Sequence, residues 1–98
     1  MIVELSDPAE IDLEAIGDAI AADSPRRALS FVLELREKCL ELGDLPERYP
    51  LVPRYEARGV RRRVHGRYLI FYRVETDRVV VIHVLAGAMD YEPILFPD

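Results

Sequence analysis

The sequence predicts a small α+β fold in which strands and helices follow one another in the order β-α-α-β-β-β. Apolar residues recur at steps of three and four over residues 9–20 and again over 28–42, which is helical periodicity. Prolines then interrupt residues 44–57, and alternating or β-branched runs fill residues 59–85. We therefore expect a small, mostly antiparallel sheet with a two-helix hairpin packed on one face, and a single domain over residues 1–98.

The first strand and the start of the first helix follow from the opening residues. Residues 2–5, Ile-Val-Glu-Leu, predict a short strand. Asp7 is the expected N-cap of the helix, because its side chain can accept a backbone N–H bond and Pro8 suits the first helical position. Glu10 completes a spacing similar to that of a capping box. The acidic residues expected on the solvated face of this helix are Asp12, Glu14 and Asp18.

The second helix is expected to start at Pro25, with Ser24 as its N-cap, and to stop near Gly43. Its apolar stripe is broad, so the helix should touch both a partner helix and a sheet. The stripe holds Ala28, Phe31 or Val32, Leu35, Cys39 and Leu42, and is widened by Leu29, Leu33 and Leu40. Cys39 is the only cysteine, which excludes an intramolecular disulfide, and we expect it to be a core residue rather than a nucleophile.

Three prolines argue against regular structure in residues 44–57, so a stiff connecting loop is expected there. The residues of this loop that can dock on the core are Leu45, Tyr49, Leu51, Val52 and Tyr55. Strands are then expected at residues 59–65, 67–75 and 79–85, with a tight turn at His65-Gly66 between the first two. The tail is expected to hold one short helical turn.

Charge is distributed unevenly along the chain, whose formal net charge is −5. Residues 1–50 carry 12 acidic and 5 basic side chains, whereas residues 51–98 carry 6 and 8. From Arg48 to Arg73 there are eight arginines against one acid, Glu56. Two interpretations stay open: a solvated face paired with acids of the helices, or an anion-binding surface for a carboxylate-rich partner or nucleic acid.

The second face of the expected sheet also has two interpretations. Side chains alternate along a strand, so Leu69, Phe71 and Arg73 share one face of the central hairpin strand. Two helices can cover only one face of a small sheet. The other face would then expose apolar residues mixed with arginine, as in a binding groove. Alternatively, the proline-rich loop and the C-terminal tail cover it.

The sequence contains few of the residue patterns that catalytic sites need. With His65 and His83 as the only histidines and a single cysteine, we expect no metal site, and we expect no cofactor. There is no glycine-rich phosphate loop and no nucleophile elbow. His83 is expected to be a hydrogen-bonded sheet residue rather than a base. What remains is a set of residues that could bind phosphate or stabilise the transition state of RNA cleavage: Arg61, Arg62, Arg63, His65, Arg67, Tyr68, Tyr72, His83 and Tyr91.

No apolar run reaches the roughly 18–20 residues that a membrane helix needs. The first ten residues lack the basic n-region of a secretory signal. We therefore expect a cytoplasmic protein without a membrane partner.

Three segments together resemble the RelE/ParE superfamily of bacterial toxins from type II toxin–antitoxin modules, and are most similar to its ParE, or plasmid-stabilisation, branch. They are AEIDLEAIGDAIAADSPRRALSFV in the helices, GVRRRVHGRYLIFYRVE in the hairpin and VVVIHVLAGAMDYEPIL at the end. The resemblance implies a toxin that a ParD-like antitoxin neutralises by wrapping around it and folding as it binds. It also implies contact with DNA only through that antitoxin.

The branch decides the expected mechanism. RelE-like members cut messenger RNA on the ribosome, whereas ParE-like members poison DNA gyrase. RelE-type nucleases have an arginine three positions before the hairpin tyrosine, which matches Tyr72 here, so the arginine position falls on Leu69. Leucine can neither stabilise a phosphorane nor move a proton. In addition, residues 85–88 lack the basic side chains that such nucleases carry after the last strand, so we expect a toxin that is not an enzyme and that inhibits gyrase by binding.

The expected contacts with the antitoxin or gyrase are Arg61, Arg63, Arg67, Leu69, Phe71, Arg73, Met89 and Tyr91. Met89 stands where many ParE-like tails have an arginine before the acidic residue, here Asp90. Two alternatives remain. The chain could be a RelE-like ribosome-dependent mRNA endonuclease that uses Arg61, Arg63, His65 and Tyr91, or a non-toxic fold relative that acts only in a complex.

Overall fold

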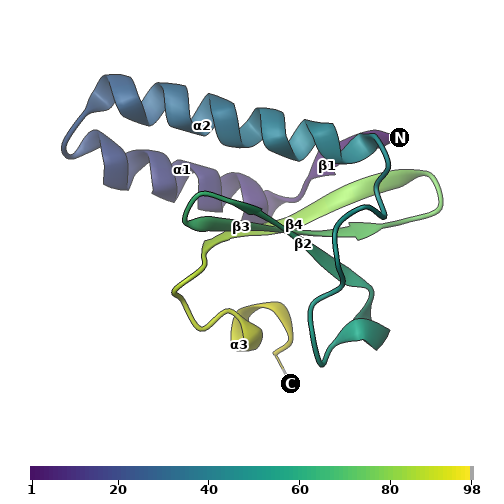
Figure 1. The fold of residues 1–98 in the computed structure, drawn as a ribbon. Helices are drawn as coiled ribbons and strands as arrows, with labels where there is room; N and C mark the ends of the chain where they lie inside the picture. Colours follow the sequence, from purple (N-terminus) through teal and green to yellow (C-terminus); the bar gives the residue numbers. More distant parts are fainter. Residues whose placement is uncertain (98) are drawn as a thin grey trace.

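The computed structural model describes residues 1–97 and confirms the predicted α+β fold (Figure 1). The elements are β1 (Ile2–Leu5), α1 (Asp7–Ala21), α2 (Pro25–Leu40), β2 (Val60–His65), β3 (Tyr68–Val74), β4 (Arg78–Ala86) and α3 (Glu92–Leu95), with 3-10 turns at Glu41–Gly43 and Glu56–Arg58. The strand order in the sheet is β1-β4-β3-β2. Strand β1 runs parallel to β4, and the other two pairs are antiparallel. No helix within residues 1–97 is long and apolar enough to cross a membrane.

Both long helices start at a serine cap. Ser24 caps α2 as predicted, since its Oγ accepts a hydrogen bond from Arg27 N at 3.2 Å. The cap of α1 is Ser6 rather than Asp7: Ser6 Oγ accepts from Ala9 N at 3.2 Å, and Asp7 is the first helical residue. The same hydroxyl donates to Ile82 O in β4 at 3.1 Å. A tertiary bond to the sheet therefore supplements the local preference and places the cap one residue earlier.

The turn between β2 and β3 is also shifted by one residue from its predicted place. Strand β2 continues through His65, which pairs with Tyr68, so Gly66 and Arg67 form the two-residue turn. Gly66 has a φ of 60°, a left-handed conformation that glycine adopts without steric cost.

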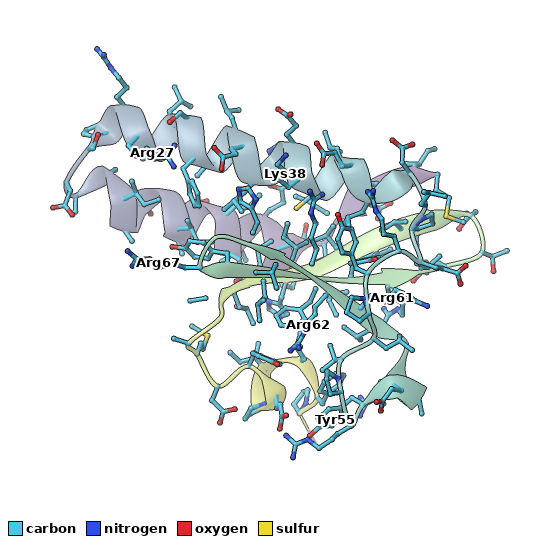
Figure 2. All side chains as sticks on the ribbon, in the orientation of Figure 1. Arg27, Lys38, Tyr55, Arg61, Arg62 and Arg67 are labelled. Atoms are coloured by element: carbon cyan, nitrogen blue, oxygen red, sulfur yellow. The ribbon has the colours of Figure 1, made fainter. Side chains whose placement is uncertain are left out.

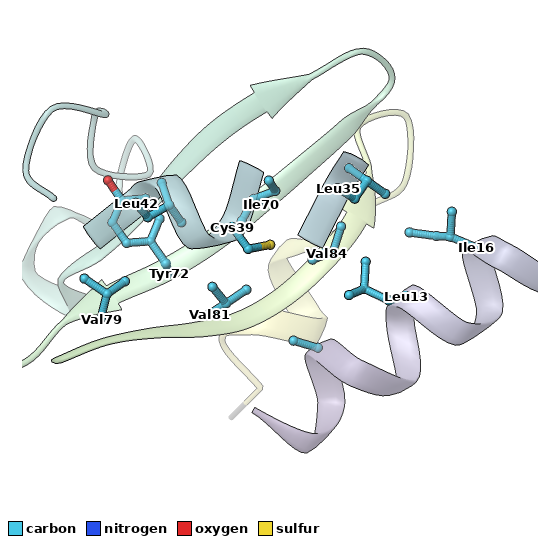
Figure 3. Close-up of a cluster of buried hydrophobic side chains, with 11 residues drawn as sticks. Leu13, Ile16, Leu35, Cys39, Leu42, Ile70, Tyr72, Val79, Val81 and Val84 are labelled. Atoms are coloured by element: carbon cyan, nitrogen blue, oxygen red, sulfur yellow. The ribbon is translucent and has the colours of Figure 1, made fainter. Parts of the chain in front are cut away.

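The main core lies between the helix hairpin and one face of the sheet (Figure 3). Leu13 of α1 and Leu35 of α2 meet Ile70 and Val81 of the sheet, and each side chain is at most 1% exposed. Burying a side chain of this size contributes about 1.5–3 kcal/mol. Cys39 is fully buried in the same cluster, as predicted, and its burial raises the pKa of the thiol to about 12.

The apolar stripe of α2 is narrower than predicted. Ala28, Leu35 and Cys39 are the buried residues of this helix, where it contacts α1 and the sheet. The three leucines that were expected to widen the stripe face away from the core and are more than half exposed: Leu29, Leu33 and Leu40. A single sheet and a single partner helix do not surround α2, so one side of it has no neighbour within residues 1–97.

The second face of the sheet is covered, so the expected exposed groove on that face is wrong. Val52 of the proline-rich loop and Phe96 of the tail are 1% and 6% exposed, and they form a second core with the sheet. Leu69 and Phe71 lie within this cluster at 8% and 0% exposure. Figure 1 shows the loop before β2 and α3 on the side of the sheet opposite the long helices. The alternative expectation, in which the loop and tail cover this face, is the correct one.

Asp12 also differs from expectation. It lies on the side of α1 that faces β4, where its side chain is 18% exposed, and Oδ2 is 2.9 Å from Val84 N. The acidic stretch of α1 is therefore not entirely solvated.

Candidate partner-binding groove

Tyr68 lines three hollows of about 540, 250 and 500 Å³, and we call these three hollows together the Tyr68 groove. The first lies between the helix hairpin and the β2–β3 turn, and its walls include Ile20, Ser24, Arg27, Phe31 and Arg67. The second lies between α1 and the end of β4, beside Ala15, Ile16, Val84 and Met89. The third runs past Val64, Leu69, Gly87 and Ala88.

The topology places this groove at one end of the molecule. The α1–α2 turn, the β2–β3 turn and the end of β4 all lie at the same end (Figure 1). Tyr68 starts β3 opposite Ala86, the last residue of β4, so its ring stands where the sheet ends. The ring packs on Phe31 of α2 with 5.6 Å between centroids. The groove is therefore built from rigid elements rather than from a long loop.

The first hollow is lined by two guanidinium groups, those of Arg27 and Arg67, and by one carboxylate, that of Asp23. Figure 2 labels both arginines at this end of the molecule. Arg27 lies over the Phe31 ring at 4.9 Å and donates to Ser30 Oγ at 3.4 Å. Arg67 is exposed on the turn, where its carbonyl accepts a bond from Gly87 N at 2.7 Å. Two cations beside apolar and aromatic walls can hold a carboxylate-bearing peptide whose apolar side chains fill the hollows.

His65 and Glu34 fix the hairpin to α2 behind the groove. His65 Nε2 lies 2.6 Å from Glu34 Oε2, and this hydrogen bond holds the pKa of the Glu34 carboxyl below its usual value. The His65 ring also stacks near Phe31, with 6.3 Å between centroids. The bond and the stack together fix the wall that carries Phe31.

Of the residues predicted as partner contacts, Arg67 and Met89 line the Tyr68 groove. Met89 is 45% exposed at the rim beside the end of β4. Leu69 forms part of the third hollow of this groove. The other five predicted contacts do not line the groove.

Arg61 and Arg63 point toward the last turn of α2 and the segment that follows it, and both are mostly covered. Arg61 donates to the carbonyls of Tyr49 and Glu47 at 2.8 and 3.2 Å. Arg63 donates to Lys38 O at 2.9 Å and lies 3.0 Å from a Glu41 carboxylate oxygen. The expected pairing with acids of the helices is therefore found only in part: Arg63 pairs with Glu41, but both arginines are mostly covered and bind backbone carbonyls rather than forming a solvated face or a free anion-binding surface.

Phe71 and Tyr91 pack against each other on the opposite face of the sheet, with 4.8 Å between ring centroids. Arg62 holds Tyr91 there by donating to its hydroxyl at 2.7 Å, and Figure 2 shows Arg62 on the side of the sheet away from the long helices. Arg73 is exposed near the far end of β3, 3.7 Å from Glu75. The eight predicted contacts therefore do not form one continuous surface.

The residues of the predicted nuclease alternative do not converge either. Arg61, Arg63 and His65 alternate along the helix-facing side of β2, where each bonds to α2 or to the segment after it. Tyr91 belongs to the cluster on the other face of the sheet. These four side chains are not placed around one substrate position.

Sequence reasoning missed Arg27 and the Phe31–Tyr68 contact as groove residues. Arg27 stands on α2 and Arg67 on the hairpin turn, and no local pattern links positions so far apart. Arg67 was predicted as a contact, and Arg27 could have been joined to it from the topology, because an αα-hairpin over a β-hairpin brings their two turns to the same end of the fold.

The comparisons with known proteins agree with this architecture. Residues 3–91 match the profile of the family described as ParE toxin of type II toxin-antitoxin system, parDE. Among solved structures, the chain is similar to one titled as a chromosomal ParDE TA system from P. aeruginosa, with a TM-score of 0.76 and 22% identity over 88% of this chain and 95% of that chain. A comparison with curated protein sequences found no match. Since the family profile spans nearly all of the sequence, this chain belongs to the ParE toxin family.

Proposed function

We propose that this chain is a toxin that inhibits DNA gyrase by binding it, and that a ParD-like antitoxin neutralises the toxin by occupying the Tyr68 groove. The match to the ParE toxin family over residues 3–91 carries this proposal. The groove adds a place for the antitoxin, because its apolar walls and its two arginines suit a peptide with apolar and acidic side chains.

The positions at which a RelE-type nuclease carries catalytic residues are buried in this chain, which supports a toxin that binds its target and does not cleave RNA. Leu69, at the position where RelE-type nucleases carry an arginine, is 8% exposed and packs in the second core. Tyr72 is fully buried, and its hydroxyl donates to Pro46 O at 2.6 Å. Neither side chain is available to a phosphodiester on the surface.

The side chains that remain free for gyrase are the exposed ones among the predicted contacts, Arg67, Arg73 and Met89. Arg67 and Met89 also line the Tyr68 groove. Because an antitoxin in the groove would cover these two residues, it would compete with gyrase for them, and neutralisation follows from that overlap.

A gyrase cleavage assay with the purified chain tests the proposed target. We expect cleaved DNA to accumulate with gyrase from the source organism, and the product of the adjacent gene to reverse this. Primer extension on messenger RNA during induction is the comparison. Codon-positioned cuts that disappear in Arg61→Ala, with gyrase unaffected, would contradict the proposal in favour of the ribonuclease, and unaffected growth on overexpression would favour a non-toxic relative.

A further inference from the structure

The outer side of α2 carries an apolar stripe that nothing within residues 1–97 covers. Leu29, Leu33 and Leu40 are 66%, 56% and 54% exposed. Their spacing of four and seven residues places them within about 40° on one side of the helix, over roughly 16 Å of its length. These are the three leucines that belong to the predicted apolar stripe of α2 but make no contact with the core of the fold.

The stripe contains no unpaired charge at its centre. Arg36 lies about 20° from Leu29 around α2, at the edge of the stripe. It donates to both carboxylate oxygens of Glu10 on α1, at 2.6 and 3.0 Å. A bidentate pair of this kind has its charge already matched. A surface that packs on the stripe would therefore not have to bury a lone guanidinium.

The charges along α2 are opposite at its two ends. The first turn carries Arg26 and Arg27 and no acid. The far end and the residues after it carry Glu37 and Asp44, and also Glu41, whose charge is already matched by Arg63 at 3.0 Å and Lys38 at 3.5 Å. A partner of uniform charge would be attracted at one end and repelled at the other. A second α2 in the antiparallel direction matches both ends.

We propose that a second copy of this chain docks on the stripe, with α2 packed antiparallel against α2 of its partner across a two-fold axis. Leu29 then faces Leu40 of the partner subunit, and Arg26 comes near the acidic end of the partner helix. The Tyr68 groove stays free, because Arg27 and Phe31 lie about 160° away from the stripe around α2. The dimer and the antitoxin can therefore be bound together.

This interface is small. One helix face of about 16–24 Å in length buries less than the roughly 800 Å² per partner of a standard interface, so we expect a dimer that forms at micromolar concentrations rather than a permanent one.

Sedimentation equilibrium of the full chain over a wide concentration range tests the proposal. We expect Leu33→Glu to weaken dimerisation about tenfold or more, because it places a charge in the apolar centre. Ile11→Glu is the matched control: Ile11 is 66% exposed on α1, and its substitution should leave the dimer unchanged. Arg26→Glu should weaken the dimer, whereas Arg73→Glu on the sheet should not. Circular dichroism and urea unfolding confirm that each variant is folded.

A wild-type chain that stays monomeric at about 1 mM, far above micromolar affinity, would overturn the proposal. So would a dimer that Leu33→Glu leaves intact, or one that Ile11→Glu weakens equally. If the wild type is monomeric and Leu33→Glu instead abolishes binding of the antitoxin, the stripe belongs to the antitoxin interface. None of these outcomes depends on whether gyrase is the target.

Discussion

Asp12 and His83 lie 2.7 Å apart, from Oδ2 to Nδ1, where α1 crosses β4. The contact sits on a bulge: Phe71 pairs with His83 and Tyr72 with Val81, so Ile82 has no partner residue on β3. The backbone groups beside the bulge bond to α1 and its cap. Ile82 O accepts from Ser6 Oγ, and Val84 N donates to the same Asp12 oxygen that His83 approaches.

Removing the Asp12 carboxylate should therefore destabilise the fold. We expect Asp12→Ala to lower the free energy of unfolding by about 1–3 kcal/mol, because Val84 N–H loses its partner in a partly buried site. Asp18→Ala, on the exposed side of the same helix, is the control and should change little. Urea denaturation of both variants gives the comparison. Equal losses would mean that the bulge does not depend on Asp12.

The second core predicts a large effect at Phe71. Its ring is fully buried, so Phe71→Ala should cost about 3–5 kcal/mol in unfolding free energy. Val64 lies on the neighbouring strand and its side chain is 64% exposed. Val64→Ala should therefore lower the free energy of unfolding far less than Phe71→Ala does. If thermal unfolding shows similar losses for both variants, the loop and tail do not cover this face in solution.

The thiol of Cys39 should be inert in the folded protein. It is fully buried and its pKa is raised to about 12 by desolvation, so almost no thiolate forms near neutral pH. We expect no reaction with Ellman's reagent under native conditions and one equivalent of reaction in denaturant. Rapid native labelling would show that the helix–sheet core opens easily.

The Glu10–Arg36 pair should contribute stability only above acidic pH. The hydrogen bond with Arg36 lowers the pKa of Glu10 in the folded chain, so the contribution is present above the unfolded pKa and is lost as the pH falls through the folded one. Glu10→Gln should cost up to about 1 kcal/mol near pH 7, as an exposed pair does, and nothing near pH 2. Urea unfolding at both values tests this, and a cost that does not change with pH would rule out the ion pair as its cause.

The sequence was sufficient for the order and type of the elements, because helical periodicity, prolines and β-branched runs are local signals. It was not sufficient to predict which segments pack against each helix and strand. Leu33 and Leu35 are equally apolar, yet only Leu35 reaches the core, since the partners of α2 are set by the topology. Phe71 packs in one cluster with Val52 and Phe96. These two residues lie in the proline-rich loop and the tail, where no helical or strand periodicity in the sequence indicates which side chains face the sheet.

The candidate site could be predicted only in part for the same reason. Arg67 and Met89 were predicted and line the groove, because a turn and a strand end are exposed in this fold. Arg61 and Arg63 carry the same charge, but Arg61 binds a carbonyl of the segment after α2 and Arg63 binds a carbonyl in the last turn of α2. Strand alternation gives the face of a side chain, and it does not say which segments cover that face.

The Tyr68 groove predicts which arginine matters for neutralisation. Arg67→Glu reverses a charge at the groove and should weaken antitoxin binding about tenfold or more, because an acidic peptide would then meet a like charge. Arg73→Glu makes the same change in charge near the other end of β3, six residues away, and is the matched control.

The most direct test of the account is therefore the affinity of the adjacent gene's product for the wild-type chain, Arg67→Glu and Arg73→Glu, measured by isothermal titration calorimetry. We predict tight binding to the wild type and to Arg73→Glu, and a clear loss for Arg67→Glu. An adjacent product that does not bind the wild type would contradict the toxin–antitoxin account, and equal binding to all three would contradict the Tyr68 groove as its site.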